Sequence, residues 1–153
     1  MKNKSYIILE IVPDRISPEK GNLVQLSAIK IKNYKLIDRF DYRLEENLIT
    51  NIDVKEMLNY DKEAFIYVKS TKDMLTSFKK WVKKANLLII DNIYTNNFLR
   101  DITNKKEFIG NYINMKYTDD FIERVIEKYG LEPTNYIVDL LYEALIYNSN
   151  EVK

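Results

Sequence analysis

Three carboxylates stand at places in the sequence where they could do chemistry: Glu10, Asp91 and Asp139. Glu10 interrupts a run of apolar residues, Asp91 directly follows another such run, and Asp139 lies in the last segment with helical periodicity. The chain has no cysteine and no histidine. Thiol nucleophiles, thiolate metal sites, disulfides and the usual neutral-pH base are therefore excluded. Any metal site must be built from oxygen ligands, which favour Mg²⁺, Mn²⁺ or Ca²⁺.

Each of these carboxylates also has an ordinary structural explanation. Glu10 could pair with a lysine or lie in water at a strand end, because an unpaired carboxylate on a central strand is costly to bury. Asp139 lies on an expected helix, where exposed carboxylates are common. Asp91 is followed by Asn92, and both residue types are standard helix caps. Taken singly, none of the three outweighs its structural explanation.

Basic residues gather in one stretch, at Lys79, Lys80, Lys83 and Lys84. The charges of the whole chain nearly cancel, with 24 basic and 23 acidic residues, so attraction to nucleic acid must come from a local patch. A solvated helix face is the default for such a run. The alternative is a phosphate-binding patch made of these four lysines.

The elements that must position these residues begin with strands. The apolar, β-branched run over residues 6–12 predicts a central strand that carries Glu10. Residues 23–31 alternate and predict a second strand with an apolar face, and residues 36–44 predict a third. The short connection over residues 32–35 implies an antiparallel hairpin between them.

The second half of the chain alternates between predicted helices and strands. Ser70 followed by Asp73 resembles a capping box, and an apolar stripe at helical spacing that includes Trp81 comes after it. Strands are predicted over residues 87–91 and 108–115. The other expected helices cover residues 53–59, residues 94–102, a segment capped by Thr118 and ended by Gly130, and a last segment opened by Pro133.

The order of these elements is three strands, helix, strand, helix, strand and two helices. It predicts an α/β protein with a mixed five-stranded sheet, three antiparallel strands plus two parallel ones, flanked by helices. One domain over residues 1–153 is the simplest interpretation, because no linker, repeat or long charge block divides the chain. No stretch approaches the roughly 20 apolar residues of a membrane span, and the N-terminus does not read as a signal peptide. We expect a cytoplasmic protein.

Five segments in this order resemble a DEDD-type (DnaQ-like) 3′–5′ exonuclease domain of the ribonuclease H-like superfamily. Residues 23–31, Leu-Val-Gln-Leu-Ser-Ala-Ile-Lys-Ile, are similar to that family's second strand, and residues 36–40 to its third. Residues 89–99 resemble its His-Asn, Phe-Asp and Phe-Leu segment. Residues 113–115 stand where the family has Ile-Asp-Thr, and residues 136–144 resemble its final helix. The similarity covers nearly the whole chain and implies a ribonuclease H-like fold.

The resemblance also implies where a metal site would lie. Enzymes of that family hold two divalent cations with four carboxylates. The family's Glu matches Glu10 and its fourth carboxylate matches Asp139, which makes these two residues implied remnants of a metal site at the carboxyl end of the central strand. The first Asp of the family falls on Ile8 and the third carboxylate on Thr95, so two of the four ligands are missing.

The base of the family is absent or displaced as well. Its His falls on Thr134, and Tyr136 lies one residue away from the spacing of the Tyr variant. We therefore expect a degenerate active site that does not degrade nucleic acid and has no cofactor. Mg²⁺ or Mn²⁺ would be needed only if the protein were active. The first hypothesis is a binding module of DNA or RNA metabolism, whose partner is a single-stranded nucleic acid or a protein.

Two other hypotheses remain open. Ribonuclease H-type sites take a carboxylate from the end of the fourth strand, where Asp91 stands. Glu10, Asp91 and Asp139 could thus form a remodelled site of a Mg²⁺-dependent 3′–5′ nuclease. A small accessory or mobile-element protein that uses the fold only as an interaction scaffold is the third hypothesis, because a fold does not fix a function.

Overall fold

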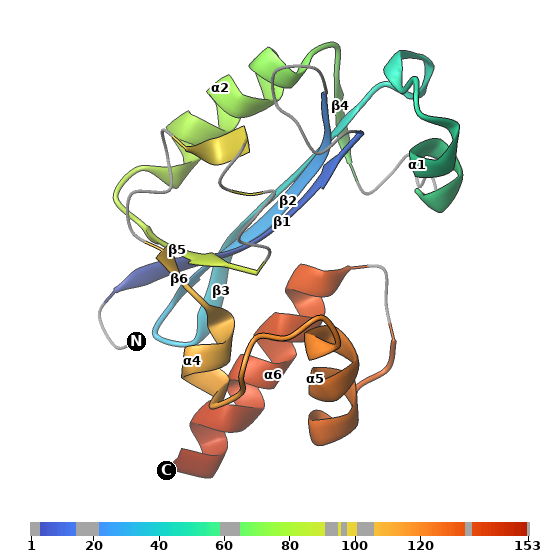
Figure 1. Cartoon of the computed structure of the whole chain (residues 1–153). Helices are drawn as coiled ribbons and strands as arrows, with labels where there is room; N and C mark the ends of the chain where they lie inside the picture. The colour runs from blue at the N-terminus through green and yellow to red at the C-terminus, as the bar shows by residue number, and fades with distance from the viewer. Residues whose placement is uncertain are drawn as a thin grey trace.

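A mixed β-sheet separates two layers of helices (Figure 1). The computed structural model describes residues 4–14, 22–58, 65–90, 95, 98–100, 106–133 and 136–152. The strand order is β4-β3-β2-β1-β5-β6. The strands are β1 (Ser5–Pro13), β2 (Leu23–Lys32), β3 (Lys35–Leu44), β4 (Ile66–Val68), β5 (Asn86–Ile89) and β6 (Lys106–Glu107).

The central strand β1 pairs antiparallel with β2 and parallel with β5. β2 and β3 form an antiparallel hairpin. Asn33 and Tyr34 at its tip both have positive φ, 53° and 62°, as a type I′ turn requires, and that turn matches the twist of the paired strands. The expected mixed sheet with its ribonuclease H-like arrangement is confirmed, and the short strand β4 extends it beside β3.

The helices divide between the two faces of the sheet. α2 (Thr71–Val82) covers one face, and α4 (Ile109–Ile113), α5 (Phe121–Tyr129) and α6 (Ile137–Val152) cover the other (Figure 1). A short 3₁₀ turn (Glu46–Leu48) and α1 (Ile52–Met57) lie between β3 and β4 in the chain. No helix in the described part of the chain is long and apolar enough to span a membrane.

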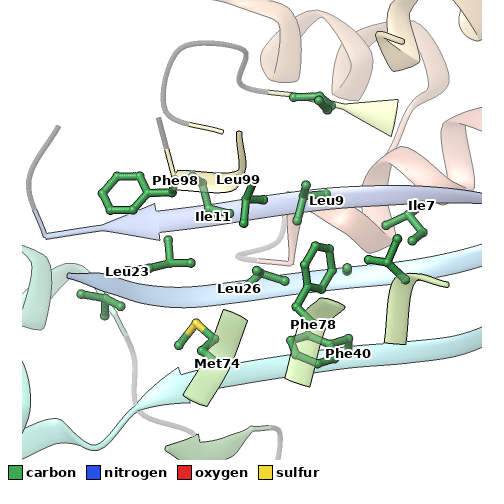
Figure 2. Packing of buried hydrophobic residues seen from close by; sticks show 14 of the residues in the cluster. Ile7, Leu9, Ile11, Leu23, Leu26, Phe40, Met74, Phe78, Phe98 and Leu99 are labelled. Carbon is green, nitrogen blue, oxygen red and sulfur yellow. The ribbon is translucent and has the colours of Figure 1, made fainter. Parts of the chain in front are cut away.

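Two apolar cores follow from this layering, because successive residues of a strand point to opposite faces. Ile7 and Leu9 of β1 pack towards α2, in a core that includes Met74 and Phe78 (Figure 2). The intervening residue Ile8 packs in the second core, on the face of α6. Tyr6 also packs in the second core, so Glu10, two residues beyond Ile8, shares the face that α6 covers.

The helix ends show which local signals acted as expected. The Ser70 hydroxyl accepts a hydrogen bond of 3.0 Å from the backbone N–H of Asp73 at the start of α2, and Gly130 ends α5 with a φ of 61°. Two expected starts are wrong. The residue that precedes α5 is Asp120, and the Thr118 hydroxyl accepts from the Arg124 side chain rather than from a backbone N–H of the first turn. α6 begins at Ile137, four residues after Pro133.

The strand expected over residues 108–115 is wrong, because α4 forms there. Ile109 and Ile113 are four residues apart and both fully buried, which is the spacing of one helix face. Gly110 permits a tight return of the chain, since a Cβ at this residue would lie 2.3 Å from the carbonyl oxygen of Met115. The strand that pairs with β5 is β6, just before this helix. Within residues 94–102, the described Thr95, Phe98 and Leu99 are helical.

Candidate functional site

Polar side chains interrupt the second core where the carboxyl end of β1 meets the start of α6. The register of the strands places Glu10 opposite Ser27 and Ser27 opposite Asp41. Gln25 and Arg43 form the neighbouring pair in β2 and β3. All of these side chains lie on the face that α6 covers. We call the following residues the polar cluster: Glu10, Gln25, Ser27, Arg39, Asp41, Arg43 and Asp139.

Glu10 is held at the first residue of α6. Its carboxylate accepts a hydrogen bond from the backbone N–H of Ile137. Its Oε2 atom is buried and has no hydrogen-bond partner among the described residues. Burial raises the pKa of Glu10 to about 7, although the Ile137 N–H and the charge of Arg43 both act to lower it. The carboxyl group is therefore divided between its protonated and ionised forms near neutral pH.

Asp139 is bound by an arginine on both of its oxygens. The Arg39 Nη1 atom donates to Asp139 Oδ1 at 2.5 Å, and Nη2 donates to Oδ2 at 3.0 Å. The same guanidinium donates from Nε to Asp41 Oδ2 at 3.1 Å. Its pKa is raised above the usual value for arginine, chiefly by the hydrogen bond to Asp139. This two-point contact is the strongest arrangement open to an arginine and a carboxylate.

Arg43 supplies a second guanidinium to the polar cluster, and it is buried. Its Nε atom donates to Gln25 Oε1 at 2.9 Å, and the Gln25 amide donates in turn to the Ser27 hydroxyl at 3.3 Å. The guanidinium carbon lies 3.9 Å from the centroid of the Phe65 ring, and that ring stacks with Tyr136. Phe65 thus packs on the arginine whose charge acts on Glu10, and Tyr136 packs on Phe65.

The two positions where the family has a carboxylate and this chain does not are Ile8 and Thr95, and both are buried. Ile8 is fully buried among the apolar side chains of the second core, and Thr95 is 1% exposed. Ile8 offers no oxygen, and apolar side chains surround it. Thr134, where the base of the family falls, and Asp91, the third member of the remodelled site, lie outside the described residues.

The polar cluster does not fit a centre of two divalent cations. Both oxygens of Asp139 are bound to Arg39, and Glu10 holds its proton more firmly than an ordinary carboxylate. Within the described ranges, no three acidic side chains lie close enough together to hold a metal ion. The positive charges beside Glu10, Asp41 and Asp139 come instead from the side chains of Arg39 and Arg43.

Comparison with known proteins finds a similarity to part of a large polymerase. No model of a known protein family matches it. It is similar to the PolC-type DNA polymerase III of Staphylococcus saprophyticus subsp. saprophyticus, with 21% identity over 148 residues, and to that of Staphylococcus aureus, with 21% identity over 154 residues. Each similarity covers 89% of this chain and 10% of the relative. The chain thus spans about a tenth of the length of these curated relatives.

The lysine run lies away from the polar cluster. Lys79 and Lys80 are exposed in the last turn of α2, and Lys83 and Lys84 follow that helix. Lys83 and Lys84 line a hollow beside Lys4, at the start of β1. Glu10 lies six residues beyond Lys4 along the chain, roughly 20 Å away at a rise of about 3.3 Å per residue. The structure therefore does not join these lysines to Glu10 and Asp139 in one site.

The arginines and Asp41 are the residues that the sequence interpretation missed. Arg39, Asp41 and Arg43 alternate along β3, and each faces α6. Alternation of charged residues in a strand places them on one face, so the signal was present. Their partners are distant in the chain: Arg39 and Asp139 are separated by 100 positions. No local pattern reveals such a pair.

Proposed function

We propose that this chain is a catalytically inactive exonuclease-fold module that binds a strand of nucleic acid in DNA metabolism. The observation that carries the proposal is the two-point contact of Arg39 with Asp139. The family resemblance assigns Asp139 to metal binding, and here an arginine engages both of its oxygens. The similarity to a DNA polymerase supports the place of the chain in DNA metabolism.

Charge balance explains why this arrangement opposes catalysis. Two Mg²⁺ ions bring four positive charges, which four carboxylates and the substrate phosphate normally offset. In the polar cluster, Arg39 and Arg43 already offset most of the charge of Glu10, Asp41 and Asp139. A cation would have to displace Arg39 from Asp139. Mg²⁺ gives up its water reluctantly and would gain few ligands in return.

The reaction would lose two contributions at once. A second cation stabilises the leaving oxygen, and a base activates the attacking water. Ile8 stands where a carboxylate of the family would bind cations, and it is fully buried in the second core. Each loss costs on the order of a hundredfold or more in rate. Together they take cleavage below detection.

A gel assay on end-labelled single and double strands tests the absence of cleavage, with Mg²⁺ and Mn²⁺ in separate reactions. We expect no shortening of either substrate. Stepwise shortening from the 3′ end that disappears in Glu10→Ala or Asp139→Ala would contradict the proposal. If Asp91→Ala also abolished such activity, the remodelled three-carboxylate nuclease would be the better account.

Calorimetric titration with Mn²⁺ tests the role of Arg39 directly. The wild-type protein should show no saturable binding. Arg39→Gln frees both oxygens of Asp139 and should gain weak binding, and the double variant Arg39→Gln with Asp139→Asn should lose it again. Saturable binding by the wild type, or binding by Arg39→Gln that survives in the double variant, would show that Arg39 is not what excludes the cation.

Binding itself is tested with a fluorescently labelled single strand and no divalent cation, read out by anisotropy. We expect saturable binding that weakens as salt rises, because phosphate contacts release counterions. A wild-type protein that binds no strand would favour the third hypothesis, an interaction scaffold for another protein.

A further inference from the structure

A hollow lined by lysines lies at the end of the sheet opposite the polar cluster. Its lysines come from three separate parts of the fold: the residue before β1, the strand β2, and the turn after α2. Its volume is about 900 Å³. We call it the lysine hollow, and its polar lining residues are Lys4, Ser5, Lys30, Lys83, Lys84 and Asn86.

The turn that carries two of these lysines has a strained backbone. The N–H of Ala85 donates to the carbonyl of Val82 at 3.1 Å, which closes a four-residue turn. Lys83 has φ 50° and ψ −120°, the conformation of the first central residue of a type II′ turn. That position strongly favours glycine. A side chain kept there in spite of the strain is a recognised sign of a functional role.

The ammonium group of Lys30 is held in place in the lysine hollow by Trp81. Lys30 Nζ donates to the backbone carbonyl of Trp81 at 2.5 Å and lies 4.4 Å from the centroid of the Trp81 ring. Its pKa is lowered mainly by burial and further by the charge of Lys83, while Asp38 acts to raise it. Lys30 and Lys83 are therefore close enough to repel each other.

The lysine hollow carries excess positive charge. The negative charge of Asp38 acts to raise the pKa of Lys30. The same carboxylate accepts a hydrogen bond from the Trp81 indole at 2.9 Å. Among the described residues, no ion pair within 4.0 Å includes Lys4, Lys83 or Lys84. Such a concentration of one charge attracts an anion, which would relieve the repulsion between the lysines.

We propose that the lysine hollow binds phosphate groups of a nucleic-acid strand. The proposal rests on the nucleic-acid binding of the proposed function and locates it away from the polar cluster. Lysines serve as point charges for phosphate, and the Ser5 hydroxyl and Asn86 amide add uncharged hydrogen-bonding groups. Val82 and Ala85 are the apolar members of the lining. They give an acidic peptide little to anchor on, so a phosphodiester backbone is the better occupant.

Anisotropy with a fluorescein-labelled oligothymidylate, without divalent cations, tests this site. Lys83→Ala with Lys84→Ala removes two charges from the hollow. Lys79→Ala with Lys80→Ala removes two charges from the neighbouring turn of α2, outside the hollow, and is the matched control. We expect the first variant to bind about tenfold more weakly. The slope of its log binding constant against log salt concentration should become shallower by roughly 1.4, which is about 0.7 for each of two lost phosphate contacts. The control should stay close to the wild type.

Lys83→Gly separates binding from folding. Glycine suits the backbone of this position, so the melting temperature should stay the same or rise while affinity for the oligothymidylate falls. If Lys83→Gly binds as the wild type does, the Lys83 ammonium is not part of the site and the inference fails. A lower melting temperature would refute the strain on which the argument depends.

The remaining outcomes separate this inference from the proposed function. If both double variants lose the same affinity for the oligothymidylate, the loss is a general charge effect. The hollow would then not be the binding site, although nucleic-acid binding by the protein would stand. No binding by the wild type would overturn both. Stronger competition by polyglutamate than by unlabelled oligothymidylate would assign the hollow to an acidic protein. If the protein binds no strand but inorganic phosphate changes the NMR chemical shifts of residues in the hollow, the hollow is a site for the free anion.

Discussion

Glu10 combines burial with two groups that favour its ionised form. The Ile137 N–H and the charge of Arg43 lower its pKa, but burial outweighs them and leaves the pKa at about 7. The ordinary value is 4.5, so the folded state binds this proton more tightly than the unfolded state does. The contribution to stability is therefore complete below about pH 4.5 and is lost as the pH rises through 7.

We predict that the free energy of unfolding of the wild type, relative to Glu10→Gln, falls by at most about 3 kcal/mol between pH 4.5 and 8. The glutamine keeps an acceptor for the Ile137 N–H and has no charge to bury. Urea unfolding of both proteins across this range provides the measurement. A difference between them that is constant with pH would show that Glu10 ionises as an exposed carboxylate does.

At the scale of elements, α4 depends on a backbone approach that only glycine allows. Gly110 lies so close to the Met115 carbonyl that a Cβ would be 2.3 Å from its oxygen. We predict that Gly110→Ala destabilises the protein by about 3 kcal/mol, because a rigid backbone atom must move. Gly130→Ala is the control: nothing lies within 4 Å of its Cβ, and the positive φ alone strains it.

The control should cost only about 1 kcal/mol, since a left-handed residue with open space around it is merely disfavoured. Denaturant midpoints and slopes of the two variants give the comparison. Equal losses would mean that Met115 moves freely and that α4 is not fixed by this contact.

At the scale of the whole molecule, Ile8 belongs to the layer that joins the sheet to α6. It is fully buried, and the helices on its face pack against the same core. We predict that Ile8→Asp, which restores the first carboxylate of the resembled family, destabilises the protein by on the order of 4 kcal/mol. It should not produce nuclease activity, because Arg39 still binds Asp139.

Ile8→Val is the matched change in size without charge and should cost about 1 kcal/mol. Chemical denaturation measures both variants, and the gel assay with Mn²⁺ measures cleavage. A stable Ile8→Asp protein that shortens DNA from the 3′ end would show that a working metal site lies one substitution away, and the inactive module would be the wrong account.

The sequence by itself determined the elements with strong local signals. The apolar run before Pro13 formed the central strand, the alternating segments formed the hairpin, and Ser70 began α2. The strand predicted over residues 108–115 is wrong, because a short apolar segment is consistent with either a strand or a helix. In the folded protein this segment forms the helix α4, and Ile109 and Ile113 are buried on the same face of it.

Only the tertiary structure decided what the remaining carboxylates do. Glu10 and Asp139 could be named from the sequence as remnants of a metal site, but their neighbours could not. Arg39 binds Asp139 across 100 positions of the chain. Lys83, in a turn without glycine, lies near enough to Lys30 for its charge to lower the pKa of Lys30. Both facts arise from side chains brought together by the sheet, and such contacts leave no periodic trace in the sequence. The physical reason is that electrostatic partners depend on distance in space, whereas strands and helices depend on spacing along the chain.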